Sequence, residues 1–207
     1  MIDWLFECKD KLRQDDHSVV HHAVCLMDQY YQSLSTDKPS KDLQLTAVTA
    51  FFIQNKNLEV DPIDLHLCYK TLCYNKYTRQ QFLTKEKDIR KACQYLNEHP
   101  VPVDYVMFYS KLIRFHSSHC CGSDDKILRF IANVERIAML FSKFSLIDAS
   151  MNKYKPSVVA ATFVFVGFKL AFEKVIEKTP GIARFLSLRL VKQISQVYRV
   201  WRFTVLQ

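Results

Sequence analysis

The sequence contains few of the residues that build turns. Only three glycines and six prolines occur among its 207 residues. A β protein of this size needs many turns and uses more glycine and proline than this. We therefore expect an all-α fold, and the length allows one large or two small domains.

Signals for disulfide bonds and for export are also missing. The seven cysteines are odd in number, and no two of them form a Cys-x-x-Cys pair. This usage is typical of reduced thiols in a reducing compartment. The N-terminus has no basic stretch followed by an apolar run and a small-residue cleavage site, which an export signal would have. We expect a cytoplasmic or nuclear protein.

Motifs of the common enzyme classes are absent: there is no glycine-rich phosphate loop, nucleophile elbow or metalloprotease motif. Two groups of residues have ligand-like spacing, His17, His21 and Cys25 on one helical face and His116, His119, Cys120 and Cys121 in a predicted loop. Neither group matches a settled zinc pattern. We expect a binding or regulatory protein rather than an enzyme, with no metal and no cofactor.

The most informative stretch is residues 43–59, LQLTAVTAFFIQNKNLE. Between Leu43 and Ile53 the only polar side chains are Gln44, Thr46 and Thr49, so a helix here is apolar on nearly every face. Such a helix belongs inside a protein, and the run is too short to span a bilayer. We expect the central helix of a bundle, with Lys56 at its polar rim.

Four more helices are expected in the first hundred residues, over residues 2–12, 17–34, 61–73 and 78–96. Apolar residues recur at three-to-four spacing in the second of these. Asp61 followed by Pro62 is a good N-cap for the third, and Thr78 with Gln81 has capping-box spacing at the start of the fourth.

The prolines at positions 100 and 102 cannot continue the preceding helix, so we place a domain boundary there. The predicted domains are residues 1–99 and 103–207. In the second, helices are expected over residues 103–115, 127–141, 156–172 and 179–203, with a loop over 116–125. An amphipathic helix, a polar break and an all-apolar helix thus occur twice, which an internal duplication would produce. The pattern predicts two bundles of about five helices, the second one helix short.

One charged residue occupies a predicted core position. Phe82, Ile89 and Cys93 form a helical stripe, and Glu86 lies in it where an apolar residue is expected. A buried carboxylate is costly unless it is paired, and Lys56 is the obvious partner. The pair could simply stabilise the fold, Glu86 could turn to solvent, or the pair could bind the backbone of another protein. We predict that the two side chains lie within salt-bridge distance.

The net charge of +8 permits an acidic partner without identifying one. In the predicted last helix, four basic residues lie opposite an apolar stripe: Arg189, Lys192, Arg199 and Arg202. They are either a solvated face or a contact for phosphate or an acidic protein.

Several stretches resemble the cyclin family. MIDWL at the N-terminus resembles the start of a cyclin box, and AVCLMDQYY at residues 23–31 resembles its second helix. LQLTAVTAFFIQNK resembles the central helix, and YTRQQFL with Glu86 resembles the fifth. In the second half, FSLIDASMNKYKPSVVA at residues 144–160 is similar to the start of the central helix in the second fold of A- and B-type cyclins. The resemblance covers nearly the whole chain and implies tandem cyclin folds.

The resemblance also implies a function. Cyclins perform no chemistry; they bind a cyclin-dependent-type protein kinase and stabilise its active conformer, which is a population shift. The implied kinase-binding residues are Lys56, Glu86, Asn57, Glu59, Arg90 and Tyr95. The implied patch for docking substrate or inhibitor peptides contains Met1, Trp4 and Gln44.

Three positions depart from the family pattern. Asn57 replaces an aromatic residue, Leu58 replaces an acid, and Arg90 replaces an apolar residue of the kinase contact. Polar groups at an apolar contact lower the affinity for an unaltered partner. The departures therefore favour an alternative, a structural or scaffold protein of a larger assembly that keeps the fold without activating a kinase. The +8 charge suggests a third interpretation, a nucleic-acid-binding fold like that of general transcription factor IIB, but the missing zinc ribbon counts against it. No membrane partner is expected.

Overall fold

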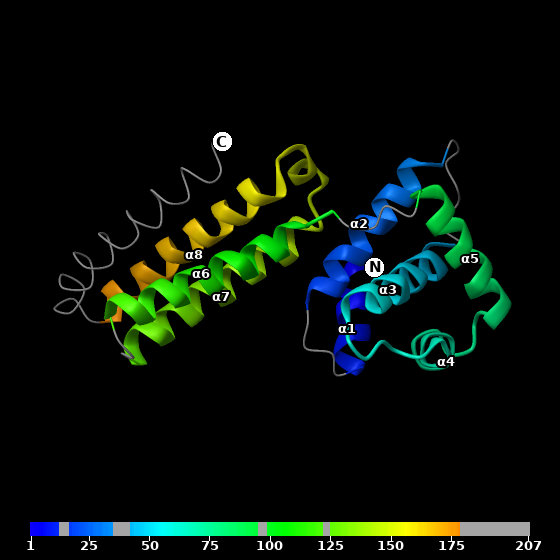
Figure 1. Ribbon diagram of the computed structural model, residues 1–207, viewed down its shortest axis with the longest axis horizontal. Helices are drawn as coiled ribbons and strands as arrows, with labels where there is room; N and C mark the ends of the chain where they lie inside the picture. The colour runs from blue at the N-terminus through cyan, green and yellow to red at the C-terminus, as the bar shows by residue number, and fades with distance from the viewer. Residues whose placement is uncertain (13–16, 35–41, 95–98, 122–124, 179–207) are drawn as a thin grey trace. The chain divides into compact units, whose positions relative to one another are not determined.

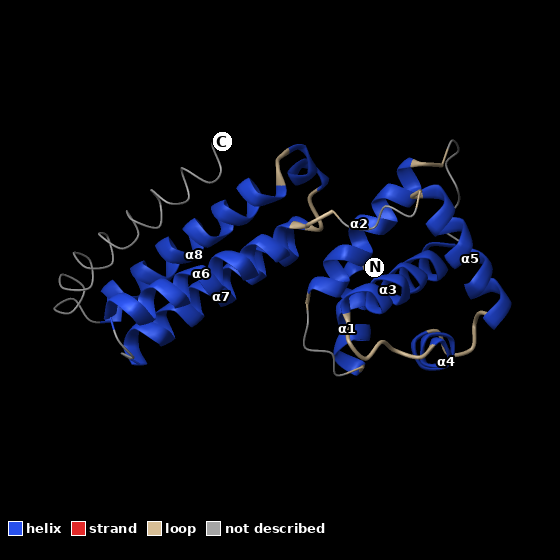
Figure 2. Cartoon of the chain, in the orientation of Figure 1, coloured by secondary structure: helices blue, strands red, loops and turns tan. Residues whose placement is uncertain are grey.

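A computed structural model describes residues 1–12, 17–34, 42–94, 99–121 and 125–178. The described residues form helices joined by short loops, with no strand among them (Figure 2). The predicted all-α class is confirmed. Contacts within the chain divide it into two compact units, Met1–Val101 and Pro102–Gln207, and we describe each by itself.

The described residues of the first unit form the helices labelled α1 to α5 (Figure 1). They are α1 (Ile2–Lys11), α2 (Ser18–Gln32), α3 (Leu43–Leu58), α4 (Leu65–Leu67) and α5 (Arg79–Ala92); α4 continues into a π-helical turn, Cys68–Leu72. Helix α3 contacts α1, α2, α5 and the π-helical turn. Every residue from 45 to 55 is buried, so the predicted central helix is confirmed.

One hydrophobic cluster joins α3 to its neighbours. Its buried members are Cys8, Leu45, Val48, Phe52, Cys68, Leu72, Cys73, Tyr77 and Phe82. Trp4 of α1 packs against it, only partly buried. Because the cluster includes Phe52 from α3 and Phe82 from α5, apolar packing sets these two helices side by side at the level of Lys56 and Glu86.

Helix α4 begins later than the sequence predicts. An N-cap at Asp61 would have to bind the N–H group of the second or third helical residue, Ile63 or Asp64. The buried Asn55 instead accepts the Ile63 N–H group through Oδ1 at 2.7 Å. The actual cap is Asp64, whose Oδ1 accepts the His66 N–H group at 2.7 Å. A contact from a distant helix therefore decides where α4 starts.

The predicted start of α5 is confirmed and its predicted end is wrong. Thr78 Oγ1 accepts the Gln81 N–H group at 3.2 Å, and Gln81 Oε1 accepts the Thr78 N–H group at 2.8 Å, which completes the capping box. The helix ends at Ala92 rather than near residue 96, and Gln94 adopts a left-handed φ of 52°. Such a backbone stops a helix.

The second unit contains α6 (Pro102–Cys121), α7 (Asp125–Ser145), a 3₁₀ turn (Ala149–Lys153) and α8 (Pro156–Lys178). The loop predicted over residues 116–125 is wrong for residues 116–121, which extend α6. Histidine, serine and cysteine are only mildly unfavourable in a helix, so packing against α7 and α8 can override the local composition. The helix predicted over residues 179–203 lies outside the described residues.

The three long helices of this unit enclose a second core, which includes Val106, Ile131, Val134, Ala160 and Phe163. Helices α7 and α8 approach closely at Gly167. A Cβ atom at that position would lie 2.8 Å from the Val134 carbonyl oxygen, inside contact distance. Only glycine therefore fits this crossing without displacing backbone.

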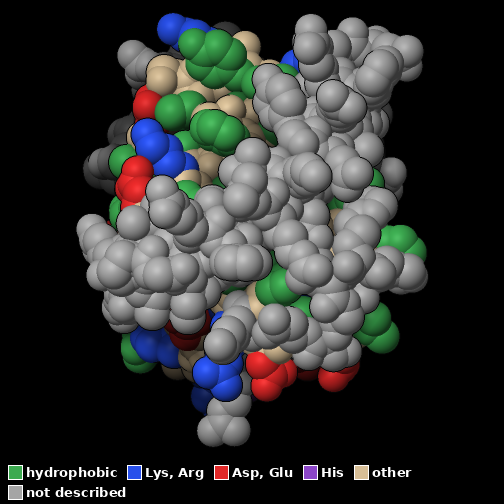
Figure 3. Space-filling model, turned by 90° about the vertical axis from the view of Figure 1, so that its left-hand side faces the viewer, with side chains coloured by type: hydrophobic (Ala, Val, Ile, Leu, Met, Phe, Trp, Pro, Cys, Tyr) green, Lys and Arg blue, Asp and Glu red, His purple; other side chains and the backbone are tan. Residues whose placement is uncertain are grey.

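Helix α8 is buried on one side only. Val159 and Val164 face the core, whereas Phe165 is 57% exposed. Figure 3 draws one face of the molecule, and in its described parts hydrophobic side chains lie next to basic ones. Among the described helices, α8 alone is long and apolar enough to cross a membrane, and 39% of that stretch, Pro156–Lys174, is buried. Core helices of globular proteins meet the same criterion, so the finding is weak evidence for a membrane span.

Candidate protein-binding site

Lys56 lies in the last turn of α3, where the buried helix reaches the surface. Its ammonium group is 4.6 Å from the centre of the Phe52 ring, one turn earlier on the helix. Phe52 is itself buried in the cluster between α3 and α5. The cation–π contact and the fixed ring hold the lysine side chain near α5 while 37% of it stays exposed.

Glu86 lies on the face of α5 that meets α3. Phe82 and Ile89, which flank it along the stripe, are fully buried, and the Glu86 side chain is 13% exposed. Lys56 Nζ donates a hydrogen bond to Glu86 Oε1 at 2.9 Å. The predicted ion pair is confirmed, and it forms because the apolar packing between α3 and α5 brings Lys56 and Glu86 together.

Arg90 joins this pair from within the chain. Its Nε and Nη2 atoms donate to the same Glu86 Oε1, at 3.2 and 3.1 Å. The sequence contained the signal, since an acid followed four residues later by a base on a helix forms such a pair. We call Lys56, Glu86 and Arg90 the charged cluster. Two cations share one carboxylate, so the cluster has an excess of one positive charge.

The electrostatics of Glu86 follow from this geometry. Burial disfavours its ionised form, but hydrogen bonds and charges from Lys56 and Arg90 outweigh burial and hold the pKa of Glu86 below its ordinary value. The carboxylate is therefore ionised at neutral pH. Because both cations bind through rigid helices, the cluster is preorganised for a partner that accepts hydrogen bonds.

Exposed apolar residues flank the charged cluster at the end of α3. Leu58 and Val60 are both exposed. Asn57 is exposed and donates to Gln54 Oε1 at 3.4 Å, and Glu59 ends the helix, its N–H group bonded to Asn55 O. The surface around the cluster thus combines apolar side chains with an unbalanced cation. Tyr95, the remaining predicted member of this site, lies outside the described residues.

A buried lysine that the sequence analysis did not predict lies beside this site. Lys85 is only 7% exposed, and its Nζ lies 3.3 Å from Asp42 Oδ2 and 5.6 Å from the centre of the Tyr30 ring. Burial lowers the pKa of Lys85, but Tyr30 and Asp42 outweigh burial and raise it above its ordinary value. The contact ties α5 to the start of α3 and the end of α2, and so helps to position Glu86.

The predicted peptide-docking residues belong to the same unit, Met1 and Trp4 at the N-terminus and Gln44 in the first turn of α3. Met1 is exposed, and Trp4 is partly buried against the cluster that contains Tyr77. Gln44 Oε1 accepts hydrogen bonds from Lys76 Nζ at 2.9 Å and from the Tyr77 hydroxyl at 3.4 Å. The amide oxygen of Gln44 is thus already engaged within the chain.

No group of three or more ligand side chains among the described residues could hold a metal ion. In the first candidate group, His21 is buried, its Nδ1 lies 2.9 Å from His17 O, and its ring packs edge-on against Phe6. The side chains of His116, His119, Cys120 and Cys121 lie outside those described.

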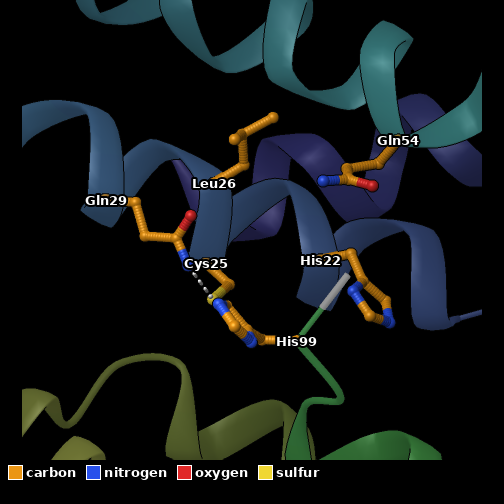
Figure 4. A pocket seen from close by; sticks show the side chains of 6 residues that line it. All are labelled: His22, Cys25, Leu26, Gln29, Gln54 and His99. Carbon is orange, nitrogen blue, oxygen red and sulfur yellow. Dashed lines mark hydrogen bonds between the residues drawn. The ribbon is translucent and has the colours of Figure 1, made fainter. Parts of the chain in front are cut away.

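A pocket in the first unit is lined by His22, Cys25, Leu26, Gln29, Gln54 and His99 (Figure 4). Gln29 Nε2 lies 3.7 Å from Cys25 Sγ, one turn away on the same helix, α2. The pocket encloses about 10 Å³, the room of a single water molecule. It is too small for a cofactor.

Comparison with known proteins identifies relatives of this chain. The family model described as "Cyclin, N-terminal domain" matches residues 1–101. Cyclin-A3-2 of Oryza sativa subsp. japonica is 32% identical over 169 residues, covering 80% of this chain and 40% of the relative. G2/mitotic-specific cyclin-B1 of Anguilla japonica is 24% identical over 170 residues, covering 82% of this chain and 38% of the relative. The chain thus spans about two fifths of the length of these relatives.

Proposed function

Because this chain belongs to the cyclin family, we propose that it is a regulatory subunit that binds and activates a protein kinase of the cyclin-dependent type. The observation that carries the proposal is the Lys56–Glu86 ion pair, with 2.9 Å between Nζ and Oε1. It lies where the buried helix α3 and the helix α5 reach the surface together. Glu86 is well enough shielded to be preorganised, and Lys56 is exposed enough to be reached.

The proposed mechanism needs no catalytic group in this chain. A kinase with an active and an inactive conformer shifts towards the conformer that its partner binds more tightly. The rigid charged cluster and the exposed Leu58 and Val60 would bind one helix of the kinase in its active position. Differential affinity for the two conformers then supplies the activation.

The internal bond of Arg90 narrows the kind of kinase surface that fits. Glu86 Oε1 already accepts from both cations, so a partner cannot use that oxygen without competing with Arg90. The cluster's excess positive charge favours a partner with a carboxylate or several carbonyl oxygens facing Lys56 and Arg90. A guanidinium buried without such acceptors would cost several kcal/mol, about 3–5 on comparable pairs.

We further propose that Met1, Trp4 and Gln44 form a docking patch for substrate or inhibitor peptides. Trp4 supplies an aromatic surface over the hydrophobic cluster, and Gln44 adjoins that cluster through Tyr77. Free thiols at Cys8, Cys25, Cys68, Cys73 and Cys93 fit a protein of the cytoplasm or nucleus.

The second candidate function is that of a scaffold subunit that keeps the fold without activating a kinase. The hydrogen bond from Arg90 to Glu86 favours the scaffold function, because charged groups that bond one another within the chain do not require a partner. The polar Asn57 and the apolar Leu58 at the end of α3 add to this case.

Isolation of the protein from its native source, followed by identification of what co-purifies and by a kinase assay, tests the proposal. We expect a protein kinase in the isolate, and we expect Lys56→Ala to abolish its activation while the protein stays folded. Lys87→Ala removes an exposed lysine from α5 outside the cluster and is the matched control. An assembly without a kinase, or a Lys56→Ala protein that activates normally, would favour the scaffold.

A further inference from the structure

A strained turn in the first unit displays an aromatic ring. Tyr74 and Asn75 follow one another with φ of 49° and 58°, a left-handed backbone that is costly for residues other than glycine. Hydrogen bonds from the Asn75 N–H group to Tyr69 O and from the Lys76 N–H group to Cys73 O, both 2.9 Å, hold the turn. Cys73 and Tyr77 anchor it in the hydrophobic cluster, whereas Tyr74 is 75% exposed. A turn with a left-handed backbone therefore holds the Tyr74 ring in solvent.

Two lysines lie on either side of this turn. Lys11 Nζ, from the end of α1, is 5.9 Å from the centre of the Tyr74 ring. Lys76 Nζ is bonded to Gln44 Oε1 at 2.9 Å and lies 5.3 Å from the centre of the Tyr77 ring. Neither lysine forms an ion pair with another described residue, whereas Lys9, on the same helix as Lys11, pairs with Asp10 at 3.1 Å.

Two buried thiols of the hydrophobic cluster, Cys8 and Cys73, lie near the two lysines. Burial raises the pKa of Cys8 to about 12, and Lys11 acts against that rise. Burial likewise raises the pKa of Cys73 to about 11, and Lys76 acts against it. Cys8 and Cys73 belong to the same hydrophobic cluster, and each lies three residues before one of the two lysines, so Lys11 and Lys76 lie at the edge of one cluster. Glu7, one turn before Lys11 on α1, offsets part of the positive charge.

We propose that Lys11, Tyr74 and Lys76 form a binding site for an acidic peptide segment. The Tyr74 ring offers an apolar platform that an extended chain can lie against, and the two lysines offer cations to its carboxylates. A basic segment would meet like charges at the same place. This site lies beyond the proposed docking patch, which it touches at Gln44, and it does not require that the protein bind a kinase.

Two synthetic peptides of equal length test the site on the full chain by fluorescence anisotropy. Both contain the same leucine and phenylalanine residues; one has glutamates and the other lysines at the remaining positions. We expect the acidic peptide to bind at least about tenfold more tightly, with an affinity that falls as salt is raised. Lys11→Glu combined with Lys76→Glu should remove this preference, and Tyr74→Ala should weaken binding severalfold.

Lys87→Glu is the matched control, since it reverses an exposed lysine of α5 away from the turn. Circular dichroism of each variant checks that the helices remain. Equal binding of the two peptides, or an equal loss in Lys87→Glu, would overturn the site. Complete competition by inorganic phosphate, or tighter binding of an oligonucleotide, would overturn the assignment to a peptide. None of these results depends on kinase activation, so failure here leaves the proposed function standing.

Discussion

Two of the described helices, α3 and α8, are both rich in apolar residues but have different surroundings. In α3 every residue from 45 to 55 is buried, because α1, α2, α5 and the π-helical turn surround it. In α8 the described contacts are with α6 and α7, and Phe165 and Leu170 remain exposed. An all-round apolar helix therefore predicts a core position but not how many neighbours cover it.

The units differ in charge as well. The first contains nearly equal numbers of acidic and basic residues, and the excess of basic residues lies in the second. In the first unit several charges at helix ends are paired, as Lys56 is with Glu86 and Lys85 with Asp42. The first unit is thus built around one buried helix whose end presents an organised charged cluster.

The largest effect expected from this comparison is a difference in stability between two phenylalanine substitutions, one in α3 and one in α8. Phe51→Ala removes a fully buried ring of α3 and should lower the free energy of unfolding by about 3–5 kcal/mol. Phe165→Ala removes an exposed ring of α8 and should change it by about 0.5 kcal/mol or less. Urea unfolding with hydrogen exchange resolved by peptide would report each unit. Equal losses would show that α8 is buried as deeply as α3.

A smaller loss of stability is expected at Gly167, where α8 packs closely against α7. Gly167→Ala places a Cβ atom 2.8 Å from the Val134 carbonyl oxygen, so α7 and α8 must separate. Such overpacking typically costs about 1–3 kcal/mol. Thermal unfolding measures the loss, and the hydrogen exchange of the first unit should not change. A neutral or stabilising substitution would contradict the close crossing.

The N-cap of α5, the helix that carries Glu86 and Arg90, should contribute less to stability. Thr78→Ala removes the hydroxyl that caps α5 and should cost about 1 kcal/mol. Thr78→Ser keeps the cap and serves as the control. If both variants lose the same stability in urea unfolding, the capping box does not hold α5 in place.

The smallest effect expected is a pH-dependent one from Glu86. Its pKa is lowered in the folded protein, so its ionisation stabilises the fold above the ordinary value of 4.5, and this contribution is lost as pH falls through the lowered pKa. Glu86→Gln should therefore be less stable than the natural protein at neutral pH, by about 0.5 kcal/mol. The difference should shrink below pH 4.5. A difference that does not vary with pH would contradict the ion pair.

Local patterns predicted the helices whose ends depend on nearby residues. Three-to-four spacing indicated α2, capping-box chemistry indicated the start of α5, and the apolar run indicated α3. The Lys56–Glu86 pair was also predictable, because a carboxylate on a core-facing stripe needs a cation and one lysine left the buried helix nearby.

Features set by distant contacts were not predictable in this way. The start of α4 depends on a bond from Asn55, eight residues away from Ile63. Burial of Lys85 depends on Asp42 and Tyr30, which belong to other helices. The extension of α6 over residues 116–121 was not predicted, because histidine, serine and cysteine are only mildly unfavourable in a helix and so do not mark its end. For Arg90 only acceptors on a partner were considered from the sequence, whereas Glu86, one turn earlier on α5, also accepts hydrogen bonds from it.

The central claim is that the charged cluster is a kinase-binding surface. Site-specific photo-crosslinking in extracts of the native source tests it most directly, with the crosslinker at position 57, next to Lys56, and at position 87 as the control. Our account predicts that a cyclin-dependent-type kinase is captured from position 57 and that Lys56→Ala abolishes its capture. It also predicts little capture from position 87. Absence of any kinase from position 57, or capture that Lys56→Ala leaves unchanged, would contradict the account.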